Sequence, residues 1–286
     1  MRYLEWNRRG NRRSHERAWE ECVAVQERNG AYLSVLAANS VSVSFGGVQA
    51  LDDVSLDVGE GEICGLIGPN GAGKTTFLNA ITCLTRPQRG SIQLSGRTIS
   101  NAAVRDIIGF GVARTFQNVG VYGSLSVLEN VMLGAHHKMG GRVARALLNP
   151  FGTWADEKTV RRQAESVLDE LGMAALSSVR ADSLPYPLQK RMEIARALAA
   201  EPKLLLLDEP AGGLTHGEVK EFGTLVNTIR RSRKLSILLI EHHMGLVMSL
   251  CDRIHVFHLG RNLASGRPEE IRTNEAVIDA YLGRGA

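Results

Sequence analysis

The sequence lacks any hydrophobic run long enough to cross a membrane. None of its apolar stretches approaches the roughly 18 residues that a transmembrane helix requires. The N-terminus carries arginines but lacks the apolar core of a secretory signal peptide. Any association with a membrane is therefore expected to come from a partner.

Cysteine is also scarce, and charge of one sign does not dominate. The four cysteines show no metal-ligand spacing, and Cys64 and Cys83 lie within apolar segments, which favours buried, reduced thiols in a cytosolic protein. The 34 Lys and Arg against 30 Asp and Glu give a formal charge of +4, typical of a mixed solvated surface. We therefore expect no nucleic-acid partner. With 44% hydrophobic and 22% charged residues, the 286-residue chain resembles an ordinary soluble globular protein.

Residues 1–30 differ from the rest of the chain. They contain seven arginines and five glutamates, few aliphatic residues and no repeat. This composition favours a solvated, poorly ordered extension. A wrongly assigned start site and an arm that binds a partner or a lipid surface are the alternatives.

A phosphate-binding loop follows an apolar run at Ile63–Ile67. It has the pattern G-x-x-x-x-G-K-[ST] and continues into a helix. Glycines let the loop curl with its N–H groups inward, Lys74 adds a charge for phosphates, and the Thr75 hydroxyl suits Mg²⁺. The alternative is a flexible glycine turn before a helix. The predicted nucleotide-binding residues are Gly68, Pro69, Asn70, Gly71, Ala72, Gly73, Lys74, Thr75 and Thr76.

Alternating polar and apolar residues predict an antiparallel sheet before and after this loop. Its strands are expected at residues 32–36, 41–45, 54–58 and 91–94. Phe45 ends one of them, and its ring is either a core aromatic or an exposed platform on which adenine stacks. Further along, we expect a loop at 138–155, an amphipathic helix at 157–171 ended by Gly172, a turn at 184–189 and a helix at 190–200.

Two later apolar runs end in charged residues. Leu204–Leu207 reads as a buried strand that delivers Asp208 and Glu209 to the edge of a sheet, where ligands bind. Asp208 suits a water-mediated Mg²⁺ ligand, and Glu209 suits a base that polarises the attacking water, the alternative being two solvated acids. Residues 236–240 form a similar run before His242, which is either structural or catalytic.

In order and spacing, these motifs resemble those of the ATP-binding cassette (ABC) ATPases. The likeness covers residues 31–286 and includes Gln117, which alone would be an ordinary loop amide. Within that superfamily the chain is similar to ATPase subunits of branched-chain amino acid importers. This narrower likeness lies in Phe45–Gly47, Ala113–Asn118, Leu128–Val131, Arg191–Leu198 and Ala280–Gly283.

The resemblance implies an α/β fold with a RecA-like phosphate-loop core and an antiparallel β subdomain at 31–117 and 190–286. A helical subdomain would span about 118–189. It implies ATP and Mg²⁺ as cofactors, with Phe45 on the adenine, and Thr75, Gln117 and Asp208 at the metal. Glu209, His242 and Gln117 would act in hydrolysis. It also implies a second ABC ATPase, membrane permease subunits that dock near residues 118–135, an extracytoplasmic solute-binding protein, and a place on the cytoplasmic face of the membrane.

One motif departs from the family pattern, whose signature turn reads roughly Leu-Ser-Gly-Gly-Gln. Here it is Leu184, Pro185, Tyr186, Pro187 and Leu188, without the serine hydroxyl and with a proline that has no N–H to donate. The dimer contact that follows Pro210 in this family is also altered, because Thr215 stands where an aspartate is usual. We therefore expect a hetero-dimer, in which this chain hydrolyses ATP against a partner with a complete signature. A non-transport ABC ATPase for translation or DNA maintenance, another transporter class and a small-molecule kinase are the alternatives.

Overall fold

A computed structural model describes residues 34–115, 120–136 and 150–282, with the backbone alone for residues 150–156. The predicted extension at 1–30, Gln117 and most of the predicted loop at 138–155 lie outside the described residues. Among the helices that the structure describes, none has both the length and the hydropathy to cross a membrane.

One sheet is antiparallel, as the alternating pattern predicted, with strand order β2-β1-β4-β5. The two predicted strands at 32–36 and 41–45 are a single strand, which is irregular where Ser40 adopts a φ of 50°. The polar residues between them sit in this irregularity and do not form a turn. The strands are β1 (Ser34–Phe45), β2 (Val48–Gly59), β4 (Arg89–Leu94) and β5 (Arg97–Thr98).

The second sheet has the order β10-β9-β3-β8-β7-β6, and all its strands except β10 run parallel. Strands β3, β7 and β8 are buried along their whole length, which explains why their sequences are continuously apolar. Their carboxyl ends meet at one edge. The strands are β3 (Ile63–Ile67), β6 (Val112–Arg114), β7 (Leu204–Asp208), β8 (Ser236–Ile240), β9 (Arg253–His258) and β10 (Arg261–Gly266).

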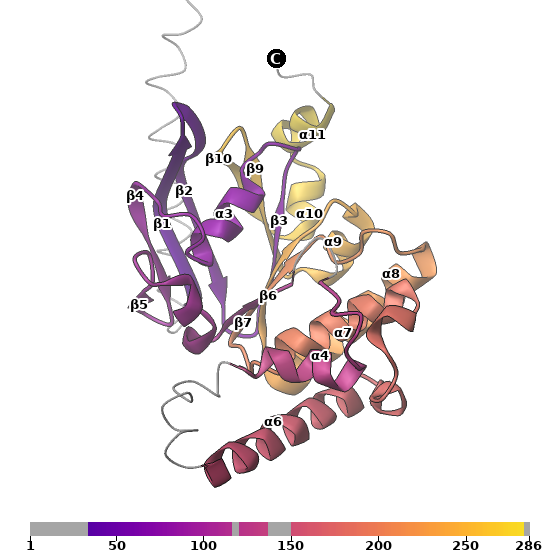
Figure 1. Cartoon of the computed structure of the whole chain (residues 1–286). Helices are drawn as coiled ribbons and strands as arrows, with labels where there is room; N and C mark the ends of the chain where they lie inside the picture. The colour runs from indigo at the N-terminus through magenta and orange to yellow at the C-terminus, as the bar shows by residue number, and fades with distance from the viewer. Residues whose placement is uncertain (1–33, 116–119, 137–149, 283–286) are drawn as a thin grey trace, which may run out of the picture.

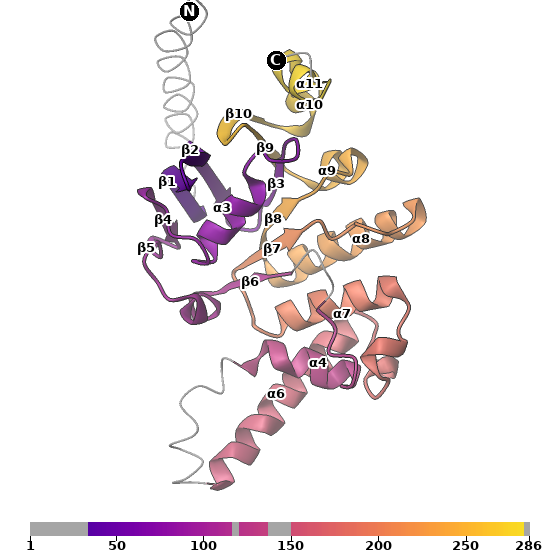
Figure 2. The same ribbon diagram turned by 45° about the horizontal axis from the view of Figure 1, so that its top comes forward.

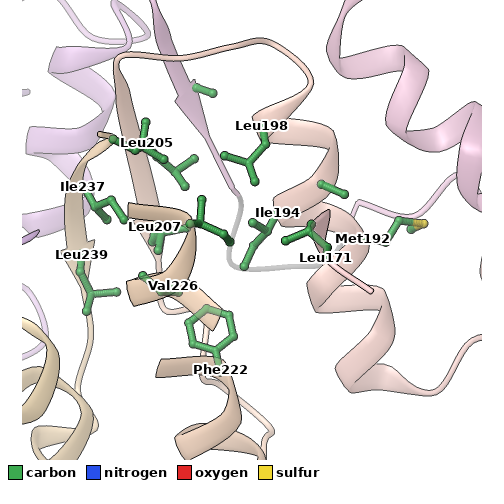
Figure 3. Close-up of a cluster of buried hydrophobic side chains, with 14 of the residues drawn as sticks. Leu171, Met192, Ile194, Leu198, Leu205, Leu207, Phe222, Val226, Ile237 and Leu239 are labelled. Atoms are coloured by element: carbon green, nitrogen blue, oxygen red, sulfur yellow. The ribbon is translucent and has the colours of Figure 1, made fainter. Parts of the chain in front are cut away.

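Helix α3 (Lys74–Ile81) lies between the two sheets (Figure 1). Its Phe77, Leu78 and Ile81 are fully buried among side chains of both sheets. The opposite face of the parallel sheet packs on α8 (His216–Arg233) through Phe222 and Val226 (Figure 3). Helix α3 therefore follows the phosphate loop directly and also contributes buried side chains to the core.

A group of helices extends beyond β6 (Figures 1 and 2). Helix α4 (Val127–Gly134) contacts α6 (Pro150–Glu170) and α7 (Tyr186–Leu198), and these two contact each other. The chain closes with α9 (Met244–Leu250), α10 (Pro268–Arg272) and α11 (Glu275–Leu282), and short 3₁₀ turns occur at 104–106, 108–110, 174–176 and 181–183. The predicted subdomain boundaries at 118 and 189 stay predictions.

Two predicted boundaries were wrong. Helix α6 begins at Pro150, so residues 150–155 are helical and not loop. Helix α7 begins at Tyr186, inside the predicted turn. In both places we read proline as a breaker, but proline is tolerated in the first turn of a helix, where its missing N–H has no intrahelical partner. Gly172, at a φ of 66°, lies just past α6 as predicted.

Candidate functional site

The phosphate loop joins the end of β3 to the start of α3, as predicted. Gly73 caps α3 in the left-handed conformation, with a φ of 99°. A Cβ on Gly73 would lie 2.7 Å from the Ala50 carbonyl oxygen, and one on Gly68 would lie 2.1 Å from that of Phe257. Both distances are too short for a real Cβ. Neighbouring backbone therefore requires glycine at both positions, in addition to the backbone conformation.

Lys74 lies inside the curl of the loop. Its Nζ donates hydrogen bonds to the carbonyl oxygens of Gly68 at 2.6 Å and Pro69 at 2.9 Å. Partial burial lowers the pKa of Lys74, while the negative charges of Glu209 and Asp208 raise it. Because those charges act on Lys74, the structure brings the two acids after the leucine strand to the phosphate loop. An ammonium group so placed is suited to bind the oxygens of an anion.

Asp208 ends β7 and is almost fully buried, with its carboxylate held by an arginine. Its Oδ2 accepts a hydrogen bond from Arg114 Nη2 at 2.8 Å. Arg114 Nη1 donates to Asn79 Oδ1, also at 2.8 Å, so one guanidinium links β6, β7 and α3. Neither Arg114 nor Asn79 has a role of its own in the sequence-based predictions. The sequence carried no signal for this pairing, because it does not show that β6 lies beside β7.

Glu209 turns the chain sharply after β7. Its φ is 48°, in the left-handed region that non-glycine residues seldom adopt, and its N–H donates to the Ile240 carbonyl oxygen at 2.9 Å. The Nδ1 atom of His242, from the loop after β8, lies 3.9 Å from Glu209 Oε2. Strained backbone of this kind gathers at functional sites. The structure thus brings Glu209 and His242 together.

Glu241 is a buried residue at this edge to which the sequence assigned no role. Only 2% of it is exposed, and its carboxylate accepts backbone hydrogen bonds from Ala211 at 2.7 Å, His242 at 3.0 Å and His243 at 3.2 Å. It therefore ties the loop after Glu209 to the loop that carries His242. An acid directly after a fully apolar strand was the sequence signal for it.

Phe45 lies at the end of β1, with 52% of its surface exposed. The structure thus decides against a core aromatic and for an exposed ring next to the Gly46–Gly47 turn. Its contact with an adenine stays a prediction, since stacking depends on a nucleotide.

The altered signature turn opens α7. Pro185 caps the helix, and Pro187 occupies its first turn. Tyr186 is exposed, its hydroxyl donates to the Gly212 carbonyl oxygen at 3.1 Å, and a Cβ on Gly213 would lie 3.0 Å from its ring. The turn is thereby attached to the segment that follows Glu209 in the same chain.

Tyr281, near the C-terminus, also reaches the phosphate loop. Burial raises the pKa of its phenol, and a hydrogen bond with the Gly68 backbone lowers it. In the sequence analysis Tyr281 has no role beyond its part in the family resemblance. Helix α11 is thereby connected to the first glycine of the phosphate loop.

The residues at this edge suit a magnesium ion held together with a phosphate. Thr75 and Asp208 offer hydroxyl and carboxylate oxygens, the ligands that Mg²⁺ prefers. Within the described ranges there is no group of three or more His, Cys, Asp or Glu that would enclose a metal by itself. Such a sparse set fits Mg²⁺, which usually keeps waters and completes its shell with substrate phosphates.

A parallel sheet with a phosphate loop, an acid-ended strand two places away in the same sheet and an antiparallel sheet on α3 defines a cassette that binds and hydrolyses ATP. A family model described as "ABC transporter" matches residues 51–212, more than half of the chain. The chain belongs to the ABC transporter family and is one of its ATP-hydrolysing, ATP-binding proteins. A model described as "Branched-chain amino acid ATP-binding cassette transporter" matches residues 261–286.

Curated relatives align over nearly their whole length. A high-affinity branched-chain amino acid transport ATP-binding protein, LivG of Salmonella typhimurium, is 41% identical over 249 residues, covering 87% of this chain and 98% of the relative. BraF of Pseudomonas aeruginosa, with the same description, is 37% identical with the same coverage. The lipopolysaccharide export ATP-binding protein LptB of Haemophilus influenzae is 31% identical, covering 88% of this chain and 98% of the relative.

Solved structures confirm the fold. The crystal structure of a nucleotide-free ATP-binding cassette from an ABC transporter superposes with a TM-score of 0.76 at 28% identity, covering 87% of this chain and 98% of that one. The α/β cassette architecture predicted from the sequence is therefore correct.

Proposed function

We propose that this chain powers an importer of branched-chain or related amino acids from the cytoplasmic face of the membrane. One observation carries the proposal. The match to relatives named for branched-chain amino acid transport reaches 41% identity across 98% of their length. The separate family model at residues 261–286 supports it, because this segment lies outside the general cassette match.

The residues of the site divide the work of hydrolysis. Phe45 stacks on adenine, while the loop amides and Lys74 bind the phosphates. Glu209 polarises the attacking water and accepts its proton, and His242 contacts the γ-phosphate. Their proximity, 3.9 Å between His242 Nδ1 and Glu209 Oε2, supports a joint role at one phosphate.

Thr75, Asp208 and Gln117 would hold Mg²⁺. When bound, this ion neutralises charge on the phosphate oxygens. Asp208 is oriented for it by Arg114, and Thr75 by its place at the start of α3. Gln117 lies outside the described residues, so its part rests on the family pattern alone.

The partners follow from membership of the ABC transporter family and from the altered signature turn. A second ABC ATPase closes over the ATP, membrane permease subunits dock near residues 118–135, and a solute-binding protein delivers the cargo. We propose that the ATPase pair is unequal, because Pro185 lacks a hydroxyl and Pro187 lacks an N–H where a γ-phosphate needs donors. This chain then hydrolyses ATP in its own pocket and serves poorly as the opposite face.

Uptake by the native host tests the proposal. The chromosomal copy is replaced with the Glu209→Gln variant, and uptake of radiolabelled leucine, isoleucine and valine is compared with that of amides, urea and aromatic acids. We expect uptake of one of these classes to fall to background, while the protein level stays normal. A polytopic membrane protein should copurify with the tagged wild-type chain.

Normal uptake of every solute tested would contradict the importer. Loss of an exported lipid would instead indicate the transporter class of the 31% identical relative. A normal membrane phenotype with a defect in translation or DNA maintenance would indicate a cassette that does not serve transport.

A further inference from the structure

The buried pair of Arg114 and Asp208 lies behind the proposed magnesium site. Both side chains are only 8% exposed, and Arg114 Nη2 lies 2.8 Å from Asp208 Oδ2. A second hydrogen bond of 2.8 Å runs from Arg114 Nη1 to Asn79 Oδ1. The planar guanidinium can hold two partners at once in a fixed geometry, which a lysine cannot.

The partner on α3 lies on a functional face of that helix. Asn79 follows Thr75 by four residues, and residues four apart are neighbours on a helix surface. The guanidinium therefore joins the helix that carries the Thr75 hydroxyl to the strand that carries the Asp208 carboxylate. These are the two described residues that the proposed function assigns to Mg²⁺.

The end of β6 is also fixed to the end of β7. The Thr115 N–H donates to the Leu206 carbonyl oxygen at 3.0 Å, and the Asp208 N–H donates to Thr115 Oγ1 at 3.4 Å. Arg114 is thus held in place by its own strand, and it can hold Asp208 in turn. A carboxylate accepts about four hydrogen bonds, so the bond from Arg114 leaves Asp208 able to face a metal-bound water.

We propose that Arg114 is a positioning residue that, with Asn79, presets the separation and orientation of Thr75 and Asp208 for Mg²⁺. The inference rests on the proposed function, because it assumes a metal–nucleotide complex in this pocket. A residue behind a metal ligand typically changes metal affinity by about 10–100-fold when it is removed.

The test measures metal affinity without relying on hydrolysis. Mn²⁺ replaces Mg²⁺ as a spectroscopic probe, and its binding to the protein with a non-hydrolysable ATP analogue is followed by electron paramagnetic resonance. For Arg114→Gln we expect Mn²⁺ affinity to fall at least about tenfold. Binding of the analogue in EDTA should change by less than about threefold, since the loop amides are untouched.

Two matched variants separate position from charge. Asn79→Ala keeps the guanidinium and removes its anchor on α3, and Arg114→Lys keeps the charge and loses the fork. If Arg114 positions Asp208, both weaken Mn²⁺ binding by about three- to tenfold. Unchanged Mn²⁺ affinity in both Asn79→Ala and Arg114→Lys would overturn the proposal. This test remains valid if Arg114→Gln does not fold.

Two further outcomes have distinct meanings. Equal or tighter Mn²⁺ binding by Arg114→Gln would show that Arg114 is only a counter-ion for Asp208, and would overturn the inference. Failure of the wild-type protein to bind the analogue in the presence of Mn²⁺ would instead overturn the proposed function itself.

Discussion

At the scale of single residues, two adjacent acids differ because their backbones differ. Asp208 is the last residue of a buried strand, and Arg114 holds its carboxylate. Glu209 adopts a φ of 48° directly after the strand, and it retains 25% exposure of its side chain. A base that acts on water needs this partial exposure, whereas a metal ligand benefits from a fixed position.

Glu209→Gln is therefore expected to stop hydrolysis and to leave nucleotide binding intact. An amide cannot accept the proton of the attacking water, so turnover should fall by about 10²–10⁴-fold. Phosphate release and retention of ATP measure the two effects. Lys74→Ala is the control that weakens binding itself, and turnover near the wild-type rate in Glu209→Gln would show that another group is the base.

His255 is a buried titratable residue on β9 with no part in the site. It is 0% exposed, and neither ring nitrogen has a hydrogen-bond partner in the part of the chain that the structure describes. Burial, and then the positive charge of Arg253, lower its pKa from 6.5 to about 4. The folded protein thus keeps this imidazole neutral at a pH where the unfolded chain would protonate it.

The free energy of unfolding should consequently decrease on acidification. Above pH 6.5 the histidine is neutral in both states and has no effect. Between pH 6.5 and 4 only the unfolded state gains the proton, which costs the folded state about 3 kcal/mol by pH 4. Urea unfolding at several pH values measures this loss, and His255→Leu should remove it. An equal pH dependence in the variant would contradict the lowered pKa.

At the scale of elements, the site depends on how the loops after β7 and β8 are joined. The Glu241 carboxylate accepts hydrogen bonds from the backbone of Ala211, two residues after Glu209, and from His242 and His243. The two parallel strands bring these loops side by side, and one buried acid fixes their spacing.

Glu241→Ala is expected to lower both stability and turnover. It leaves three backbone N–H groups without their acceptor, which should cost about 2–4 kcal/mol in the free energy of unfolding. Because Ala211 loses its anchor, Glu209 should also shift relative to His242, and kcat should fall more than nucleotide affinity. Denaturant unfolding and steady-state hydrolysis measure the two effects.

Glu218, a second glutamate that accepts a backbone hydrogen bond, provides the matched control for Glu241→Ala. Glu218 accepts hydrogen bonds from the N–H and the hydroxyl of Thr215 at the exposed start of α8. Glu218→Ala should leave kcat unchanged. A comparable loss of turnover in both variants would mean that Glu241 has no special part in aligning the site.

At the scale of the whole molecule, the proposed unequal pair rests on a difference between two motifs of this chain. Its own phosphate loop and acids are complete, whereas the signature turn that would meet a partner's ATP carries Pro185 and Pro187. The Tyr186 hydroxyl donates a hydrogen bond to the Gly212 carbonyl oxygen, which attaches this turn to the segment after Glu209 in the same chain.

Restoring the turn with the double change Pro185→Ser and Pro187→Gly should raise the turnover of a homodimer. The serine hydroxyl and the glycine N–H would return two donors to the γ-phosphate, and each charge-assisted hydrogen bond is worth about 1.5–3 kcal/mol. Hydrolysis by the purified chain alone, at a concentration that saturates dimer formation, measures the gain. A wild-type homodimer that already turns over at full rate, with no gain from the double change, would refute the unequal pair.

The local parts of this protein follow from its sequence alone. The phosphate loop, the buried strands before Asp208 and Glu241, and the capping of α6 by Gly172 depend on backbone conformation and apolar periodicity within about ten residues. The start of α7 was misplaced because proline permits two local structures, and packing of the helix against α4 and α6 selects one of them.

The tertiary structure decided how distant residues meet. Asn79, Arg114 and Asp208 come from three elements spread over 130 positions, and the order β8-β7-β6 brings two of them to one sheet edge beside α3. The same holds for the exposure of Phe45, the anchoring role of Glu241 and the contact of Tyr281 with the phosphate loop. Spacing along a chain carries no record of strand order, whereas the energies of buried ion pairs and hydrogen bonds depend on it directly.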